Sequence, residues 1–208
     1  MGSAAAGRGD QRASGAPETS SRPDPPRERI LTAASELFAR HGIRAVGVDA
    51  IIAAAGVAKA SFYRHFRSKD DLVAAWLRDG RARWLDRARV QTAARATSPS
   101  DELLVFFDVV LELEDDPNFY GCPYLNTAAE LRDAPGVVRR EMVDFIDEVE
   151  AYLEDLARRA GLRSPGAVAL QLRLLAAGMF ALMNVYGGDA TSGAKARQAA
   201  AAIIDAAR

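Results

Sequence analysis

The chain has 208 residues, is 49% hydrophobic and carries a formal net charge of -1, a composition that excludes disorder throughout. Its longest unbroken apolar run, Leu174 to Met183, stops after ten residues, well short of the roughly 20 needed to span a bilayer, so we expect no membrane partner. A single cysteine and no apolar leader predict a soluble protein of the reducing cytoplasm.

The charges are distributed unevenly along the chain. Residues 1–99 contain seventeen Lys and Arg against ten Asp and Glu, whereas residues 100–160 contain five against sixteen. The basic part is where a polyanion such as DNA would bind, although two differently solvated surfaces would give the same division. Composition leaves both interpretations open.

The N-terminal residues 1–24 are rich in Gly, Ala, Ser, Pro and Arg without apolar periodicity, which predicts a disordered arm. From Pro25 onward the apolar residues recur at helical spacing and no strand pattern competes, so we predict an all-α fold. Gly42 and Gly56 stop the first two helices. Ser68 caps the fourth. These first four helices are predicted at about 27–41, at 49–55, from about 59, and from 68 to about 95.

Proline and glycine clusters divide the rest of the chain into further helices. The helices predicted between them span 101–114, 124–132, 137–160, 166–186 and 194–207. Together the patterns predict a disordered arm at 1–24, a three-helix head at 25–70 and a larger helical body at 71–208.

Two short helices joined through Gly56-Val57-Ala58 are typical of a helix-turn-helix, whose second helix lies in the DNA major groove. Helical spacing turns Phe62 and Phe66 toward the core of the head and their neighbours outward. The outward groups are donors suited to phosphates and base edges. The residues predicted to contact DNA are Lys59, Ala60, Ser61, Tyr63, Arg64, His65 and Lys69.

The run from Ala50 to Leu72 resembles the TetR/AcrR family of bacterial regulators. It contains Ala-Gly-Val, a small residue before an aromatic-Tyr pair, then His-Phe, and Ser-Lys with an acid and Leu. The resemblance covers about residues 27–75. It implies that phosphates are held by Tyr63, His65 and Lys69, while bases or the adjoining backbone are faced by Lys59, Ala60, Ser61 and Arg64.

The sequence departs from the family pattern at the start of the second helix. The family's usual Thr-Val-x-Asp is Gly47-Val48-Asp49-Ala50 in this chain. Glycine can cap a helix but has no hydroxyl, so residue 47 is not counted as a DNA contact.

The resemblance also implies that the body binds a small-molecule effector, although the likeness fades after about residue 80. Aromatic residues from several predicted helices meet in a common interior and would line a mostly apolar pocket. Each would equally fit an ordinary core. The pocket residues predicted are Trp76, Trp84, Phe106, Phe107, Tyr120, Cys122, Tyr124, Asn126 and Phe145.

The helices at 137–160 and 166–186 present apolar faces, and family members pair these two helices with their copies in a four-helix bundle. The faces would also fit packing within one chain. A homodimer sets its recognition helices about 34–36 Å apart or a multiple of it, which suits a pseudo-palindromic operator. The interface residues predicted are Met142, Val149, Leu174, Ala177, Gly178 and Ala181.

The sequence therefore predicts a ligand-relieved repressor that binds a double-stranded DNA operator as a homodimer, with no cofactor and no metal. An enzyme would have to pair Cys122 of the body with His41 or His65 of the head, and no phosphate-binding loop or metal-spaced cluster occurs. Two alternatives stay open: a helical protein-interaction module, and a redox-sensing regulator in which a helix N-terminus lowers the pKa of Cys122. The sequence does not decide between repression and activation.

Overall fold

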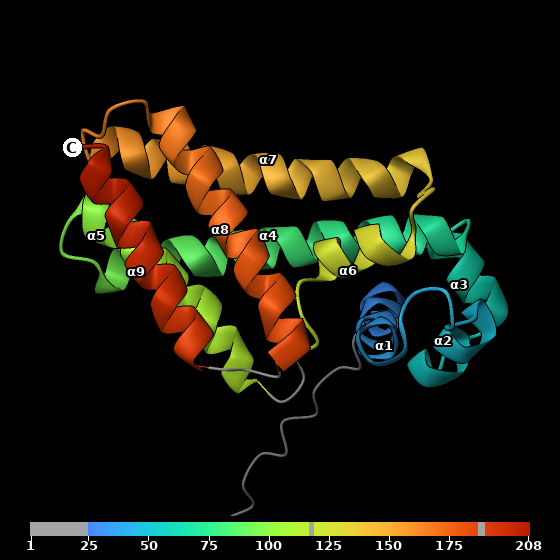
Figure 1. The fold of residues 1–208 in the computed structure, drawn as a ribbon. Coiled ribbons are helices and arrows are strands. Elements are labelled where there is room, and N and C mark those ends of the chain that lie inside the picture. Colours follow the sequence, from blue (N-terminus) through green and yellow to red (C-terminus); the bar gives the residue numbers. More distant parts are fainter. Residues whose placement is uncertain (1–24, 117–118, 187–189) are drawn as a thin grey trace, which may run out of the picture.

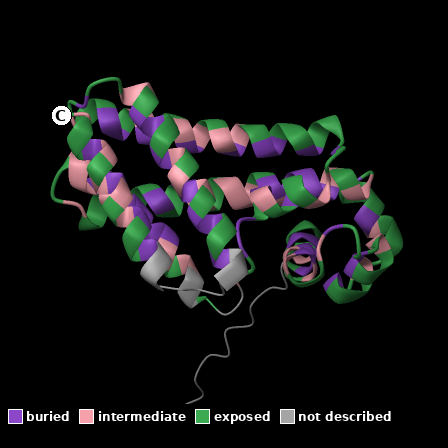
Figure 2. Ribbon diagram, in the orientation of Figure 1, coloured by how far each residue is buried: buried purple, intermediate pink, exposed green. Residues whose placement is uncertain are grey.

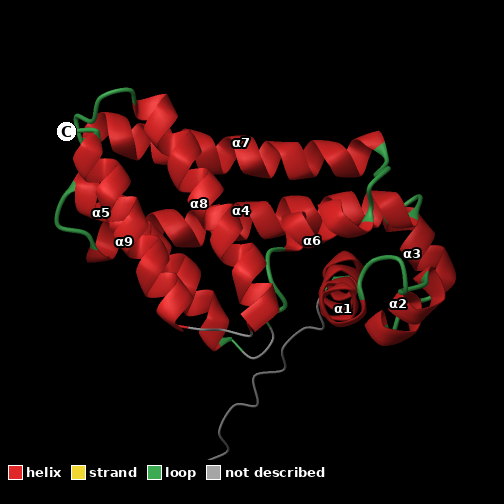
Figure 3. Ribbon diagram, in the orientation of Figure 1, coloured by secondary structure: helices red, strands yellow, loops and turns green. Residues whose placement is uncertain are grey.

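The computed structural model describes residues 25–116, 119–186 and 190–208 (Figure 1). These described residues contain helices and turns but no strand, so the all-α prediction is confirmed (Figure 3). The arm predicted at residues 1–24 lies outside the described residues.

Three short helices form the head: α1 (Pro26–His41), α2 (Val48–Ala55) and α3 (Lys59–His65). Their common core is apolar, with Ile30, Ile51 and Phe62 fully buried. Gly42 ends α1 with a φ of 78°, and Gly56 ends α2 in the left-handed region, with φ 60° and ψ 40°. Both conformations are strained for any residue with a Cβ, which is why these two glycines mark helix ends.

Helix α4 (Lys69–Arg95) is shared by the head and the rest of the chain (Figure 1). The Ser68 side chain accepts a hydrogen bond from the backbone N–H of Asp71 at 3.0 Å, which confirms the predicted cap. The helix packs against α1 and also against α5 and α7. One continuous helix therefore connects the three-helix head of the molecule with its larger end.

The larger end consists of α5 (Pro99–Leu111), a short 3-10 turn (Glu112–Asp115), α6 (Pro123–Glu130), α7 (Gly136–Arg159), α8 (Pro165–Tyr186) and α9 (Ala190–Ala206). Most predicted bounds are right to within a few residues. Helix α9 begins earlier than the predicted residue 194 and contains Gly193. A Cβ at Gly193 would overlap the Leu111 side chain, so this glycine allows α9 to pack closely on α5.

Paired charges connect α4 to α7 inside this assembly. Arg81 lies 3.2 Å from Glu141, 3.3 Å from Asp144 and 3.2 Å from Glu148. Glu141 is 3% exposed and also pairs with Arg78. Figure 2 shows the buried residues of α7 on its inner side and the exposed ones on its outer side.

Helix α8 corrects our expectation about apolar length. Among the described helices, the segment Pro165–Met183 is long and apolar enough to cross a membrane by length and composition, with a mean hydropathy of 1.7. The unbroken run was a poor measure because it begins only after Arg173, whereas the average extends across Arg173 to Pro165. Arg173 pairs with Glu150 of α7 at 2.6 Å, and α8 packs between α7 and α9. Only 39% of the segment is buried, so much of an apolar helix is left uncovered.

We predict that Phe62→Ala destabilises the head by about 3–5 kcal/mol, because it removes a fully buried ring that contacts Tyr63 and Phe66 and leaves a cavity. Urea unfolding followed by circular dichroism measures the change. Val90→Ala is the control, since Val90 is 68% exposed and its truncation changes the free energy of unfolding by less than about 0.5 kcal/mol. Equal effects of the two substitutions would contradict the assigned core.

Candidate DNA-binding surface and effector cavity

The outward face of α3 carries the residues predicted to contact DNA. Tyr63 is 47% exposed although it adjoins fully buried Phe62, so the helix has one face in the core and one in solvent. Lys69 lies one turn away, at the start of α4. The seven predicted residues thus share one surface: Lys59, Ala60, Tyr63, Arg64 and His65 are exposed, and Ser61 and Lys69 are half-buried.

Lys59 has a partner within the head that the sequence analysis did not identify. Its ammonium group lies 3.1 Å from a carboxylate oxygen of Asp49 on α2, and both side chains are exposed. The hydrogen bond to Asp49 raises the pKa of Lys59. The Lys59 ammonium is therefore held in place on the surface, and DNA phosphates would compete with Asp49 for it.

Lys69 lies where the head meets helix α6. Burial lowers the pKa of its ammonium group, while the negative charges of Glu130 and Asp70 act in the opposite direction. Its position at the N-terminus of α4 also favours a bound anion such as a phosphate. Lys69 is thus close to both the DNA-binding surface and a carboxylate of the body.

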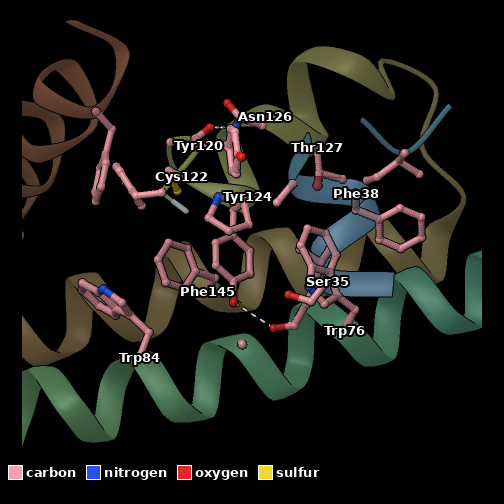
Figure 4. A pocket seen from close by; sticks show the side chains of 18 of the residues that line it. Ser35, Phe38, Trp76, Trp84, Tyr120, Cys122, Tyr124, Asn126, Thr127 and Phe145 are labelled. Carbon is pink, nitrogen blue, oxygen red and sulfur yellow. Dashed lines mark hydrogen bonds between the residues drawn. The ribbon is translucent and has the colours of Figure 1, made fainter. Parts of the chain in front are cut away.

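A cavity of about 500 Å³ lies between α1, α4, α6 and α7 (Figure 4). Seven of the nine predicted pocket residues line it: Trp76, Trp84, Tyr120, Cys122, Tyr124, Asn126 and Phe145. Phe106 instead lines a neighbouring hollow of about 30 Å³. Phe107 lines neither space, because it is fully buried in the core beside Phe106, and its prediction as a pocket residue is wrong.

Stacked and edge-on rings build the wall of the cavity. The rings of Tyr124 and Phe145 stack with centroids 3.7 Å apart, and Trp84 meets Phe145 edge-on at 5.6 Å. Phe38 of α1 meets Trp76 of α4 at 5.4 Å, so the head itself supplies part of the wall. The Tyr124 hydroxyl donates to the carbonyl of Leu77 at 2.8 Å, and burial raises its pKa. The wall is therefore apolar and held in a fixed arrangement.

A few polar groups also reach the cavity. Thr127 is 1% exposed, and its hydroxyl has no hydrogen-bond partner among the described residues. Figure 4 places it at the same end of the cavity as Phe38. The sequence analysis missed Thr127, and likewise Ser35, Arg83 and Glu130, because no local pattern distinguishes them from surface polar residues. Asn126 donates to the carbonyl of Tyr120 at 2.8 Å.

Cys122 differs from our expectation for a helix N-terminus. It is 4% exposed, and burial raises its thiol pKa more strongly than the backbone N–H groups of Leu125 and Tyr124 lower it. Desolvation of the thiolate outweighs the helix dipole, so the predicted lowering is wrong. The described residues also contain no group of three or more His, Cys, Asp and Glu side chains suited to a metal ion.

The predicted interface residues divide between buried and exposed positions. Met142 and Val149 are 9% and 6% exposed, because the apolar face of α7 packs against α4 and α8 of the same chain; their place in a dimer interface stays a prediction. Leu174 is 57% exposed. Gly178 and Ala181 are exposed as well, and Ala177 is half-buried beside the small hollow.

A helix-turn-helix head joined by one long helix to a larger helical body is the architecture of a DNA-binding transcriptional regulator. Residues 30–76 match the model of bacterial regulatory proteins of the tetR family, and residues 99–203 match that of the tetracyclin repressor-like C-terminal domain. The chain belongs to the TetR family, whose members are transcriptional regulators rather than enzymes.

Known relatives agree with this assignment. The chain is 34% identical over 120 residues to the HTH-type transcriptional repressor KstR2 of Mycolicibacterium smegmatis, a match that covers 58% of each chain and so less than two thirds of that relative. It is 32% identical over 181 residues to the HTH-type transcriptional activator FasR of the same organism, covering 79% of this chain and 78% of FasR. The crystal structure of a TetR-type regulator from Streptomyces avermitilis is similar with a TM-score of 0.77, at 34% identity over 88% of this chain and 98% of that one.

We predict that iodoacetamide alkylates Cys122 at pH 8 at least about tenfold more slowly in the folded protein than in urea, because burial blocks access and its raised pKa keeps the thiol protonated. Mass spectrometry measures the modified fraction with time, and every modification reports this one thiol. Equal rates in the two states would contradict the assignment and favour a redox-sensing role.

Proposed function

We propose that the protein is a ligand-relieved repressor that binds a pseudo-palindromic DNA operator as a homodimer. The observation that carries the proposal is the position of the cavity. Its wall includes Ser35 and Phe38 of α1, which belongs to the head, and Trp76 of α4, which begins beside the DNA-binding surface. A molecule in the cavity therefore touches the elements that orient the head.

The lining indicates the class of effector. Aromatic rings dominate the wall, and the polar groups are few, among them the unpartnered hydroxyl of Thr127 and the guanidinium of Arg83. Such a site favours a largely apolar molecule, aromatic or alicyclic, with one or two hydrogen-bonding groups that fix its orientation. A volume of about 500 Å³ is within the range of small-molecule sites.

On this proposal residues 25–70 bind DNA, and residues 71–208 bind the effector and form the dimer. Tyr63, His65 and Lys69 would hold phosphates, and Lys59, Ser61 and Arg64 would face bases or adjoining backbone. The protein would then act in the cytoplasm, where its operator is. Burial of Cys122 removes the main support for the redox-sensing alternative.

Activation is the second candidate mode of regulation. FasR, which is called an activator, matches a larger share of this chain than KstR2, which is called a repressor. A reporter gene placed behind the operator decides the sign, because deletion of a repressor raises expression and deletion of an activator lowers it.

We predict that the purified protein enriches a palindromic site from genomic fragments and that Tyr63→Ala/Lys69→Ala abolishes the enrichment. If Lys69 neutralises a phosphate, its loss makes the slope of log affinity against log salt concentration shallower by about one. The neutral Tyr63 hydroxyl contributes to affinity but not to this slope. Dissociation constants measured at about 50 and about 200 mM salt give that slope.

Lys195→Ala is the charge-matched control for this experiment, since Lys195 is exposed on α9, a helix of the body that lies away from α2 and α3 (Figure 1). Its affinity for the site should equal that of the wild type. If the wild type enriched no site at either salt concentration, the proposed operator binding would be wrong.

We expect the dimer to form through the apolar face of α8 that a single chain leaves exposed. Its exposed members are Leu170, Leu174, Gly178, Ala181 and Leu182. Small residues at 178 and 181 allow a second helix to approach closely.

We predict that Leu174→Glu makes the protein monomeric at micromolar concentration, because a carboxylate at the centre of this face would be desolvated in a dimer. Sedimentation velocity measures the change. Val90→Glu, an equally drastic substitution at an exposed residue of α4, should stay dimeric. A dimeric Leu174→Glu would place the interface elsewhere.

A further inference from the structure

Glu130, the last residue of α6, holds the turn that follows α1 in the head. Its Oε2 accepts a hydrogen bond from the backbone N–H of Ile43 at 2.8 Å, and its Oε1 accepts one from Arg44 at 2.5 Å. The two residues are 87 and 86 positions away in sequence. One carboxylate thus binds two consecutive backbone donors in the turn between α1 and α2, an arrangement we call the Glu130 clasp.

The head is shaped to receive this carboxylate. Gly42 has a φ of +78°, and a Cβ there would lie 3.0 Å from Oε2 of Glu130. The next residue, Ile43, is buried at 5% exposure, so the turn is anchored in the core of the head. A displacement of Glu130 would therefore be transmitted to the head as a whole and not absorbed by a loose loop.

The same side of α6 faces the cavity. Thr127 and Glu130 are three residues apart on this helix, so they lie on one face, and both line the cavity. Thr127 is buried and its hydroxyl has no partner, which marks the place where a bound molecule would find an unused hydrogen-bonding group. An occupant that used this hydroxyl would lie within one helical turn of the clasp.

We propose that Glu130 is the positioning residue that fixes the orientation of the DNA-binding head on the body, and that an occupant beside Thr127 acts on DNA by loosening the clasp. The inference rests on the proposed function. Helix α6 has only eight residues, so an occupant that displaces it also displaces its last residue. Loss of the clasp leaves each head folded but free to change its angle to the body.

The geometry of a dimer makes this role measurable without a known effector. Two heads bind a palindrome tightly only if their separation matches that of the half-sites. A fixed head discriminates strongly between half-site spacings, whereas a swinging head tolerates several spacings and binds the best one more weakly. Binding to a single half-site depends on the head alone and should be unaffected.

The first experiment measures affinity for a single half-site and for operators whose half-site spacing is changed by one and two base pairs. We expect wild-type affinity to fall about tenfold or more with the spacing change, and that of Glu130→Ala to fall less than about threefold, with an unchanged half-site affinity. Glu130→Gln, which keeps one acceptor, should be intermediate. Glu154→Gln is the matched control, because Glu154 pairs with Arg158 within α7.

A wild-type spacing profile in Glu130→Ala would overturn the positioning role while leaving the proposed function intact. A wild type without spacing dependence would instead overturn the dimeric operator binding, and this inference with it. If Glu130→Ala lost half-site binding through misfolding, Glu130→Gln decides, since its near-isosteric amide leaves the fold in place: a wild-type profile refutes the role and a relaxed one supports it.

The second experiment uses Thr127→Phe as a built-in occupant and Thr127→Val as its control of equal shape. We expect hydrogen exchange at the amides of Ile43 and Arg44 to become at least about tenfold faster in Thr127→Phe, and operator affinity to fall, with no change in Thr127→Val. Unchanged exchange at both amides in Thr127→Phe would refute the link between the cavity and the clasp.

Discussion

The ion pairs between Arg81 of α4 and the acidic face of α7 are the constraint on which the rest of the structure depends. Glu141 is 3% exposed, and only paired carboxylates are stable at such burial. Removal of one partner of a buried pair costs about 3–5 kcal/mol, so α4 does not slide freely along α7. Because α4 also carries Trp76, Trp84 and Lys69, this one attachment sets the cavity wall and the position of the head together.

These pairs also explain the uneven charge along the sequence. The acid-rich region from residue 100 to 160 neutralises arginines of the basic half, since Arg78 and Arg81 both face Glu141. Those two arginines are therefore paired with α7 and are not part of the predicted DNA-binding surface. The cations left on the head are fewer than the count suggested, but Lys59 and Arg64 of α3 are among those that stay exposed.

Local features of the fold were predictable from the sequence because their causes are local. Gly56 ends α2 since it can adopt a left-handed conformation, and Ser68 caps α4 through a hydrogen bond three residues on. The alternation of buried Phe62 and exposed Tyr63 follows from helical spacing alone. The DNA-binding face, which is a single short helix with its neighbours, was for this reason within reach of sequence patterns.

The cavity and its connections were predictable only in part, because they depend on which helices meet. Five of the predicted aromatic residues lie on its wall, yet Phe107 has the same chemistry and is buried in the core. Helical spacing could not tell whether Met142 and Val149 would be covered by their own chain or by a second one. Nor does any local pattern relate Glu130 to a turn 87 residues earlier.

The energies involved suit a regulator whose head must be both held and released. Hydrogen bonds to a charged group contribute about 1.5–3 kcal/mol each, so the two bonds of the Glu130 clasp together exceed the roughly 1–3 kcal/mol by which an effector typically changes DNA affinity. An occupant therefore needs to weaken the clasp and not to break it. The occupant would supply that energy by removing its own apolar surface and that of the wall from water. The cavity is apolar along most of its wall and polar beside the clasp. Binding energy from the apolar wall can therefore be used to weaken the two hydrogen bonds of Glu130.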